Sequence, residues 1–475
     1  MSNNTHIKIL RTVLKKIKPK INQEKKIKTL SEKILNIANE EAKKYDSKAI
    51  IAGSLPRNTW LVEKNEFDIF IIFPKNTDTI KLERIGLQTG KKIIQKANGK
   101  WKISYAQHPY IIGEFNGVEV DIVPCCEIKI GEKIISAVDR TPLHVEYLNK
   151  NLPKNLNEDV RLLKQFLKAN DIYGADAKTQ GFSGYLCELL IIIHGSFLNL
   201  LKSIIKWTPK QILDKENYWD KNEFKALKRR FKEDILIVID PVDKERNVAS
   251  PVSAKTFYKL KKISKEFINK PDEKYFFKME LKPLRKTDFK KYLKSRKTDF
   301  LCIIFKTPIV VPDILWPQLR KTQKRIENIL KESEFFILRS ECWSDEVKTS
   351  VILIEMQVSR LPVVDKKIGP WVFDEKNTKS FINKHETLAI TGPFIEDNTW
   401  VVEVNRKFVT AKDKLIDFLK QKKSILESNG IPNFIAESIS REFGILENEQ
   451  INKLIRKRNF GIFLRNYFEK EKLFV

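Results

Sequence analysis

The chain has 475 residues, of which 42% are hydrophobic and 32% are charged, a composition typical of globular proteins and unlike that of wholly disordered ones. At roughly 150 residues per domain, this length predicts about three domains. No apolar run approaches the roughly 18 residues that span a bilayer, and basic residues interrupt the N-terminus before a signal-peptide core develops. We therefore expect a protein that is neither secreted nor membrane-spanning.

The charge balance is strongly basic. The chain carries 89 Lys and Arg against 61 Asp and Glu, a net charge of +28, which favours a polyanionic partner such as nucleic acid. A Lys-rich genome would also explain such a composition. The five cysteines and five histidines show neither a disulfide framework nor zinc-ligand spacing. Cys125 and Cys126 are expected to be core thiols in a reducing cytoplasm.

The first part of the chain has an α/β pattern. Apolar residues recur every three or four positions over residues 22–45, which predicts an amphipathic helix. Three apolar strands are predicted at 49–52, 67–73 and 118–123. They end at Gly53-Ser54, at Pro74 and at Pro124 respectively.

The remaining chain is first helical and then mixed. Residues 157–234 have helical periodicity, which ends at an apolar run at 235–239. Residues 252–300 are predicted to be helical and are basic, with nine basic and two acidic residues over 278–297. Strands predicted at 301–305, 351–358 and 400–404 alternate with a helix at 315–332, which indicates an α+β module. A last helix at 412–428 is expected to lead into a basic tail around 456–458. We predict a multidomain α+β protein with a head at 1–145, a helical middle domain at 146–260 and an α+β C-terminal part at 261–475.

Three acidic residues form the clearest candidate site. Side chains alternate along a strand, so Glu66 and Asp68 share one face while Phe67 points into the core. Their Cα atoms are expected to lie about 6–7 Å apart, a spacing that suits two metal ions about 4 Å apart. On its own strand, the Asp121 side chain is likewise expected on the face opposite the apolar side chains. Magnesium prefers such oxygen ligands and keeps positions for water and phosphate.

Gly53 and Ser54 precede this acidic pair at the end of a strand. A helix is expected to begin near Pro56, so that backbone N–H groups and the Ser54 hydroxyl could approach a triphosphate at the helix N-terminus. Taken singly, a Gly-Ser pair is usually a turn and two acidic residues at a strand start are usually a solvated sheet edge. The combination with a third acidic strand favours a functional site.

These residues resemble the nucleotidyltransferase signature of the DNA polymerase β superfamily. The segments that carry the resemblance are 53–61 (GSLPRNTWL) and 66–74 (EFDIFIIFP). Further segments are similar to the archaeal-type (class I) CCA-adding enzymes, the tRNA nucleotidyltransferases. They are 138–144 (VDRTPLH), 160–168 (VRLLKQFLK), 173–176 (YGAD), 181–189 (GFSGYLCEL), 240–249 (DPVDKERNVA), 317–322 (PQLRKT) and 392–397 (GPFIED). The matches extend from about residue 45 to 410 and imply a polymerase β-like catalytic head followed by RNA-binding domains.

The chain departs from the family pattern at two places. Leu55-Pro56 stands where smaller residues are common, and these two residues are expected to stiffen the loop. Glu66 stands where the superfamily more commonly has Asp. A Glu at this position is compatible with the archaeal-type enzymes and with magnesium.

The resemblance implies a role for each site residue. Glu66, Asp68 and Asp121 would bind two Mg²⁺ ions that activate the tRNA 3′-hydroxyl and hold the triphosphate. Ser54 and Arg57 would contact the phosphates. The residues that would line the nucleotide pocket are His144, Lys164 and Tyr173.

Ordinary structural explanations exist for the pocket residues. Arg161, Lys164 and Lys168 form one basic stripe of a helix, and such a stripe is usually solvated. His144 is by default a structural histidine, and Tyr173 could be a packing residue at a helix end.

Enzymes of the class that this chain resembles are thought to choose CTP or ATP through hydrogen bonds from an Arg and from the RNA backbone, so the resemblance makes Arg246 the candidate for reading the incoming base. Its five donors in a fixed fork can address the acceptors of cytosine or an adenine edge and phosphate. The structural alternative is an ion pair with Asp243 or Glu245.

The resemblance implies tRNA as a partner, recognised through its acceptor/TΨC arm by shape and backbone, and CTP and ATP as substrates. Basic residues of the C-terminal part are candidate phosphate contacts: Lys286, Lys290, Lys291, Lys294, Lys297, Arg320, Lys321 and Arg325. The predicted function is template-independent addition and repair of the tRNA 3′-terminal CCA. Alternatives are a poly(A) or poly(U) polymerase-like terminal transferase, or an RNA-binding protein with an inactive head. We expect no membrane partner, and the family adds the expectation of a homodimer.

Overall fold

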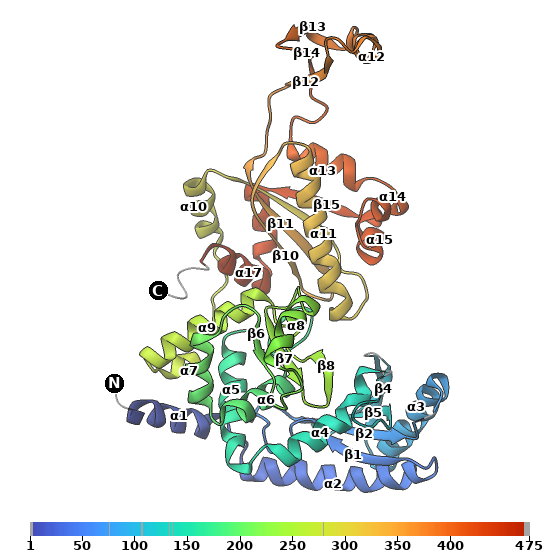
Figure 1. Cartoon of the computed structure of the whole chain (residues 1–475), viewed down its shortest axis with the longest axis vertical. Coiled ribbons are helices and arrows are strands. Elements are labelled where there is room, and N and C mark those ends of the chain that lie inside the picture. The colour runs from blue at the N-terminus through green and yellow to red at the C-terminus, as the bar shows by residue number, and fades with distance from the viewer. Residues whose placement is uncertain are drawn as a thin grey trace. The chain divides into compact units, whose positions relative to one another are not determined.

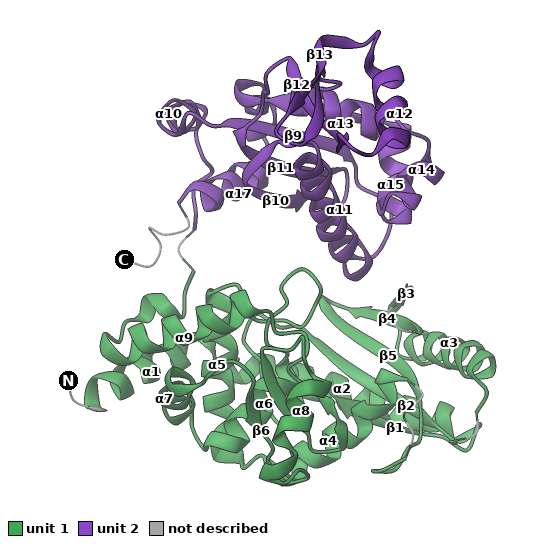
Figure 2. Ribbon diagram, turned by 45° about the horizontal axis from the view of Figure 1, so that its top comes forward, with its two compact units in different colours: residues 1–279 green, residues 280–475 purple. Residues whose placement is uncertain are grey.

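The computed structural model describes residues 3–75, 77–105, 108–132, 134, 136–278 and 280–469 (Figure 1). The chain divides into two compact units, residues 1–279 (unit 1) and residues 280–475 (unit 2), which Figure 2 colours separately. Each unit contains its own sheets, helices and apolar core.

Unit 1 contains a five-stranded sheet with the strand order β1-β2-β5-β4-β3. Strands β2 and β5 are parallel neighbours at its centre, and the other pairs are antiparallel. The strands are β1 (Lys48–Ala52), β2 (Glu66–Phe73), β3 (Lys100–Tyr105), β4 (Pro109–Phe115) and β5 (Val118–Cys126).

Helices cover both faces of this sheet. Helix α2 (Ile21–Lys43) buries Ile27, Ile34 and Ala38 against one face, together with α3 (Thr79–Lys96). Helix α4 (Arg140–Asn151) contributes Val145 to a second apolar cluster with β2 and β5. The helix predicted over 22–45 and the three predicted strands are therefore confirmed.

Strand β5 is longer than predicted, because it continues through Pro124 to Cys126. A proline lacks the N–H that a ladder needs, so a strand usually avoids it. Pro124 pairs with Ile71 of β2 and lies beyond the part of β5 that pairs with β4. The missing N–H therefore removes no bond on the β4 side of the strand.

The rest of unit 1 is mainly helical, as predicted. Its helices are α1 (Asn3–Ile17), α5 (Asn157–Ala169), α6 (Gly184–His194), α7 (Phe197–Lys206), α8 (Phe224–Arg230) and α9 (Ala254–Asn269). A small sheet of β6 (Gln211–Leu213), β7 (Leu236–Asp240) and β8 (Asp243–Asn247) accompanies them. The strand β6 lies within the stretch that was expected to be helical.

Unit 2 is built on an antiparallel sheet with the order β10-β11-β9-β15. Its strands are β9 (Asp299–Lys306), β10 (Phe336–Ser344), β11 (Thr349–Val358) and β15 (Phe443–Glu447), and its helices are α10 (Lys286–Arg296), α11 (Pro312–Glu332), α13 (Ala411–Leu419), α14 (Lys423–Ser428), α15 (Asn433–Arg441), α16 (Asn452–Ile455) and α17 (Arg458–Phe468). A second sheet of β12 (Val364–Trp371), β14 (Thr399–Asn405) and β13 (Ala389–Glu396) accompanies α12 (Glu375–His385). The predicted α+β module and its strands are confirmed.

Two expectations for the end of unit 2 are wrong. The helix expected over 412–428 is interrupted between α13 and α14. The segment after 456 is helix α17 and not a basic tail, because Phe460, Leu464 and Tyr467 are fully buried in the core of unit 2.

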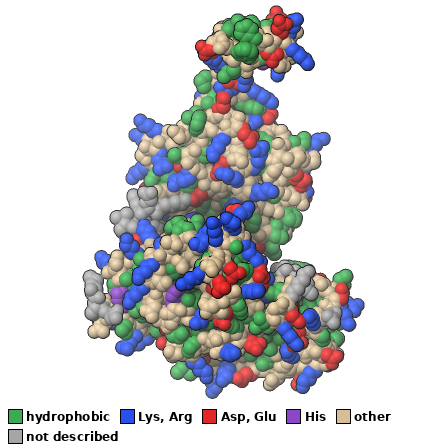
Figure 3. Space-filling view, viewed as in Figure 1, with side chains coloured by type: hydrophobic (Ala, Val, Ile, Leu, Met, Phe, Trp, Pro, Cys, Tyr) green, Lys and Arg blue, Asp and Glu red, His purple; other side chains and the backbone are tan. Residues whose placement is uncertain are grey.

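Short 3₁₀ segments complete the described elements: Ala137–Asp139, Lys154–Leu156, Lys221–Glu223, Glu273–Tyr275 and Asn448–Ile451. All five cysteines are free, and Cys125 and Cys126 are buried as expected. Lys and Arg side chains are spread over the face drawn in Figure 3 and are interspersed with Asp and Glu.

Within the described part of the chain, no single helix has the length and apolarity needed to cross a membrane, although α6 and α7 pass that test together as a pair bent by 91°.

Candidate active site

The parallel strands β2 and β5 bring two of the predicted carboxylates together. Asp68 and Asp121 are direct partners in the strand register, so their Cα atoms lie on neighbouring strands about 4.8 Å apart. The end of β1 also approaches this pair: a Cβ atom on Gly53 would lie only 2.2 Å from Asp68 Oδ2. A glycine is therefore required here to leave room for the carboxylate.

The two carboxylates perturb each other. Burial raises the pKa of Asp68 above its usual value, and the nearby Glu66 raises it further while Lys64 opposes the shift. Burial, followed by the charges of Asp68 and Glu66, raises the pKa of Asp121 to about 7. Each of these half-buried carboxylates disfavours the negative charge of the other, and a bound cation would favour the charged form of both.

Glu66 is placed differently from the other two. Its carboxylate forms an ion pair with Lys64 at 2.9 Å and its side chain is 55% exposed. Over the residues that the structure describes, no three His, Cys, Asp or Glu side chains are arranged to hold one metal ion. Asp68 and Asp121 thus fit a cation site as they stand, whereas Glu66 lies within electrostatic range and would have to leave Lys64 to join them.

The expected helix near Pro56 is absent, and that prediction is wrong. Residues 53–58 form consecutive turns, in which Asn58 N donates to Leu55 O at 3.0 Å and Thr59 N donates to Ser54 O at 3.1 Å. Gly53 and Asn58 both have positive φ, at 69° and 52°, a conformation that does not continue a right-handed helix. Any phosphate contact in this loop would use turn N–H groups and the Ser54 hydroxyl rather than a helix N-terminus.

The buried carboxylate of Glu188, on α6, binds side chains of this loop. Glu188 accepts hydrogen bonds from Arg57 Nε at 3.0 Å and Lys164 Nζ at 3.2 Å, and also from the Thr59 hydroxyl. All three charged side chains are at most 7% exposed. Burial alone would raise the pKa of Glu188, but the charges of Lys164 and Arg57 outweigh it and lower that pKa.

This network changes the interpretation of the basic stripe on α5. Lys164 Nζ also donates to Thr59 O at 3.3 Å, and Arg161 Nε donates to Trp60 O at 3.0 Å. Arg161 and Lys164 are buried, so the stripe is not a solvated face. Lys168, farther along, forms an exposed ion pair with Glu63. The roles of Arg57 and Lys164 in nucleotide binding stay predictions, and their observed contacts are with the loop.

A second buried carboxylate joins His144 and Arg246. Asp240 Oδ2, at the end of β7, accepts from His144 Nε2 at 2.9 Å and from Arg246 Nη1 at 2.6 Å. Arg246 therefore does form an ion pair, but with Asp240 and not with the two expected partners. Asp243 pairs with Arg140, and Glu245 pairs with Arg230.

Tyr173 lies beside the start of α6 and is half-buried. Its hydroxyl is close to Gly184, where an added Cβ atom would lie 3.2 Å from it. Burial raises the pKa of Tyr173 above its usual value, so the hydroxyl keeps its proton and can donate. Its contact with a nucleotide stays a prediction.

Glu188 and Asp240 are two residues of this site that were not predicted from the sequence. Each has a recognisable signal, since Glu188 interrupts the apolar run of α6 and Asp240 ends the apolar strand β7. A buried acid in such a context needs hydrogen-bond donors. What the pattern cannot show is which distant side chains supply them.

Three family models match this chain. The nucleotidyltransferase domain covers residues 31–144, the second domain of tRNA nucleotidyltransferases covers 158–277, and the C-terminal domain of CCA-adding enzymes covers 296–448. A CCA-adding enzyme of Methanosarcina acetivorans is 34% identical over 96% of this chain and 97% of its own length. The chain belongs to the CCA-adding enzyme family.

Other relatives agree. A CCA-adding enzyme of Methanocaldococcus jannaschii is 39% identical over 90% of this chain and 93% of its own length. Among solved structures, a Cid1 poly(U) polymerase with Mg 3′-dATP bound covers 58% of this chain and 100% of its own, with a TM-score of 0.44 and 16% identity, a likeness too low to indicate an activity. Family membership confirms the resemblance, the enzyme class and the polymerase β-like fold predicted from the sequence. Enzymes with this nucleotidyltransferase domain generally use divalent metal ions.

Proposed function

We propose that the chain adds and repairs the 3′-terminal CCA of tRNA without a template, using CTP and ATP and releasing pyrophosphate. The observation that carries this proposal is the pairing of Asp68 with Asp121 beside the Gly53–Ser54 turn, in a chain of the CCA-adding family. The paired carboxylates supply the charge and the turn supplies the close backbone approach that nucleotidyl transfer requires.

The carboxylates are proposed to hold two Mg²⁺ ions. Asp68 and Asp121 would be ligands of these ions, and Glu66 would join them after leaving Lys64. Magnesium bound there would lower the pKa of the attacking 3′-hydroxyl and stabilise the leaving pyrophosphate. The chain's own contribution is to hold both Asp side chains, half-buried, at paired positions of β2 and β5.

The loop and pocket residues then position the nucleotide. We assign phosphate contacts to Ser54 and to the turn N–H groups, with Arg57 and Lys164 holding the loop through Glu188 and presenting positive charge beneath it. His144 and Tyr173 are proposed to line the nucleotide pocket. These assignments rest on the contacts of the loop and on the family resemblance.

Arg246 is proposed to read the base. One of its N–H donors is used on Asp240, and its side chain is 32% exposed. A guanidinium has five N–H donors, so the remaining ones stay available for a cytosine or adenine edge.

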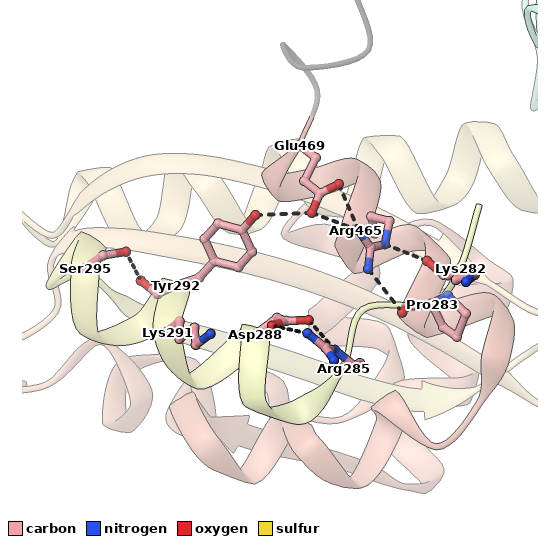
Figure 4. Close-up of a pocket in the computed structure, with 9 residues that line it drawn as sticks. All are labelled: Lys282, Pro283, Arg285, Asp288, Lys291, Tyr292, Ser295, Arg465 and Glu469. Carbon is pink, nitrogen blue, oxygen red and sulfur yellow. Dashed lines mark hydrogen bonds and ion pairs between the residues drawn. The ribbon is translucent and has the colours of Figure 1, made fainter. Parts of the chain in front are cut away.

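Unit 2 is proposed to bind the acceptor/TΨC arm of tRNA. A cavity of about 860 Å³ lies between α10 and α17 (Figure 4). Four basic and two acidic side chains line it, together with Pro283, Tyr292 and Ser295: Lys282, Arg285, Lys291, Arg465, Asp288 and Glu469. The positive excess suits an RNA backbone, which is recognised through its phosphates.

The remaining assignments belong to the same proposal. We assign catalysis to residues 1–145, nucleotide and tRNA contacts to 146–260 and arm binding to 261–475, in a cytoplasmic enzyme that works as a homodimer. Sedimentation of the purified protein tests the last point directly, and a monomer with full activity would overturn it.

The decisive experiment is nucleotide addition to a tRNA that ends at its discriminator base, with Mg²⁺ and each NTP alone or combined. CTP alone should add two residues, and CTP with ATP should add C, C and A and then stop. A long homopolymer would instead indicate a poly(A) or poly(U) polymerase, and no incorporation with several tRNAs would indicate an inactive RNA-binding protein.

Variants of the two carboxylates test the metal assignment. Asp68→Ala and Asp121→Ala should abolish incorporation. The matched control is Glu127→Gln, directly after the same strand, since the exposed Glu127 carboxylate pairs with Lys48 and should be dispensable. Full activity of either Ala variant would refute the assignment.

A further inference from the structure

Asp240 is the most heavily shared carboxylate near the proposed nucleotide pocket. Its side chain is 0% exposed and its oxygens accept four hydrogen bonds from the described residues. Oδ1 accepts from Tyr185 Oη at 2.9 Å and from Val242 N at 3.1 Å. Oδ2 accepts from His144 Nε2 at 2.9 Å and from Arg246 Nη1 at 2.6 Å. A carboxylate offers about four acceptor positions, so its capacity is used in full.

The two oxygens have different tasks. Oδ1 anchors the carboxylate to α6 through Tyr185 and to its own turn through Val242. Oδ2 accepts from His144 and Arg246. Of the four donors, these are the two that the proposed function assigns to nucleotide binding. Because both nitrogens lie within 2.9 Å of one oxygen, the imidazole and the guanidinium are held as close neighbours although they come from α4 and β8.

The ring of His144 is constrained further by stacking. Its centroid lies 3.8 Å from that of Tyr185 and the two rings are inclined by 24°. Since Nε2 donates to Asp240, the neutral ring carries its proton there and leaves Nδ1 as an acceptor. Burial lowers the pKa of His144, which favours this neutral form. The charged groups that also face it are Arg246 and Arg140.

We propose that Asp240 is a positioning residue for nucleotide selection, which sets His144 and Arg246 in one fixed arrangement through its single oxygen Oδ2. This inference rests on the proposed roles of His144 and Arg246. A site that rejects a wrong base does so because its polar groups are left unpaired by that base. Such rejection requires polar groups with fixed directions. One buried acceptor that binds both side chains fixes the directions of His144 Nδ1 and of the remaining Arg246 N–H groups.

The test is Asp240→Asn, measured as kcat/KM for CTP against UTP on tRNA ending at the discriminator base. Asn carries no negative charge, so the ion pair with Arg246 is lost. Its single oxygen can replace Oδ1 or Oδ2, and in either orientation its NH2 group faces an N–H donor: Val242 N, or His144 Nε2 and Arg246 Nη1. We expect discrimination between CTP and UTP to fall at least tenfold. The matched control is Asp243→Asn, in the same hairpin, whose carboxylate pairs with Arg140 at 3.1 Å and contacts neither donor. It should leave discrimination within twofold of the starting protein.

If Asp240 had only a structural role, its replacement would lower activity to the same extent whether or not Arg246 is present. If Asp240 acts through Arg246, then Asp240→Asn should reduce discrimination little in a chain that already carries Arg246→Met. Equal losses in the two backgrounds would overturn the proposal. Unchanged discrimination in a folded Asp240→Asn variant would overturn it as well.

A second double-mutant cycle leaves Asp240 intact and can be used if the Asp240→Asn variant does not fold. His144→Asn and Arg246→Lys should be non-additive in their effect on discrimination by at least threefold, because both side chains bind one oxygen. Additive effects would overturn the coupling. If Arg246→Met leaves nucleotide choice unchanged, the proposed function of Arg246 is wrong. If Arg246→Met changes nucleotide choice but Asp240→Asn does not, only the inference about Asp240 is wrong.

Discussion

The close approach of Gly53 to Asp68 makes a sharp prediction for Gly53→Ala. The new Cβ atom would lie 2.2 Å from Asp68 Oδ2 and 3.4 Å from its Cγ. The backbone at Gly53 has a φ of 69°, which costs a non-glycine residue about 1–2 kcal/mol. The carboxylate oxygen is at the end of a short side chain, so it is expected to rotate away rather than to unfold the sheet.

That rotation should damage catalysis far more than stability. Asp68 must withdraw by roughly 1 Å, and a misplacement of this size in a reacting site costs on the order of 10²-fold in rate. This corresponds to about 2.7 kcal/mol of transition-state stabilisation. The assay is single-turnover addition of CMP to tRNA, combined with the thermal midpoint of unfolding.

Gly117→Ala is the matched control. Gly117 lies in the turn between β4 and β5 with a φ of 80°, and no atom lies within 4 Å of the position of an added Cβ. It should lose a similar amount of stability and keep its activity within about twofold, because the backbone penalty is the same. If Gly53→Ala retained kcat/KM within threefold of Gly117→Ala, the steric argument for this site would be wrong.

Four further predictions follow from the buried and charged groups. Glu188→Gln leaves the charges of Lys164 and Arg57 buried without their partner and should destabilise unit 1 by about 3–5 kcal/mol. At ~2.1 cal/mol/K per residue, this corresponds to a fall of about 5–8 °C in its calorimetric midpoint. An unchanged midpoint would contradict the network. Burial would raise the pKa of Asp240, but His144 and Arg246 lower it to about 2, so its contribution is present above the ordinary value of 3.8 and is lost as pH falls through about 2. The deficit of Asp240→Asn in urea midpoint should therefore be constant above pH 4 and shrink between pH 4 and 2, and a deficit that grows on acidification would be inconsistent with this. Burial raises the pKa of the Cys342 thiol to about 11, so iodoacetamide at pH 8 should label it only slowly, and rapid labelling of the native protein would show otherwise. Affinity for tRNA should fall steeply with salt while single-turnover chemistry on bound tRNA changes little; equal salt slopes would argue against separate surfaces for recruitment and reaction.

Much of the catalytic head could be predicted from the sequence, because local alternation decides it. The period-two pattern of β2 puts Phe67 and Ile69 into the core and therefore places Asp68 on the other face. The same reasoning applies to Asp121 between Val120 and Ile122. These patterns act over a few neighbouring residues, so no knowledge of distant parts was needed.

Two local interpretations, the helix near Pro56 and the alternative of a solvated stripe on α5, fail for one physical reason. A helix after Ser54 was plausible locally, but Arg57 and Thr59 are bound by Glu188 from α6, and these contacts favour consecutive turns. The stripe with Lys164 was plausible as a solvated face for the same local reason. Burial and long-range hydrogen bonds override local propensity, and neither is visible in a window of a few residues.

The sequence by itself determined three of the five strands of the head sheet, the three acidic candidates and the family to which the chain belongs. Only the tertiary structure decided that Asp68 and Asp121 are register partners, that Glu66 pairs instead with Lys64, and that Asp240 holds two donors on one oxygen. The reason is that a buried charge must find its partners in three dimensions. His144 is 96 residues from Asp240 along the chain, and only folding makes them neighbours.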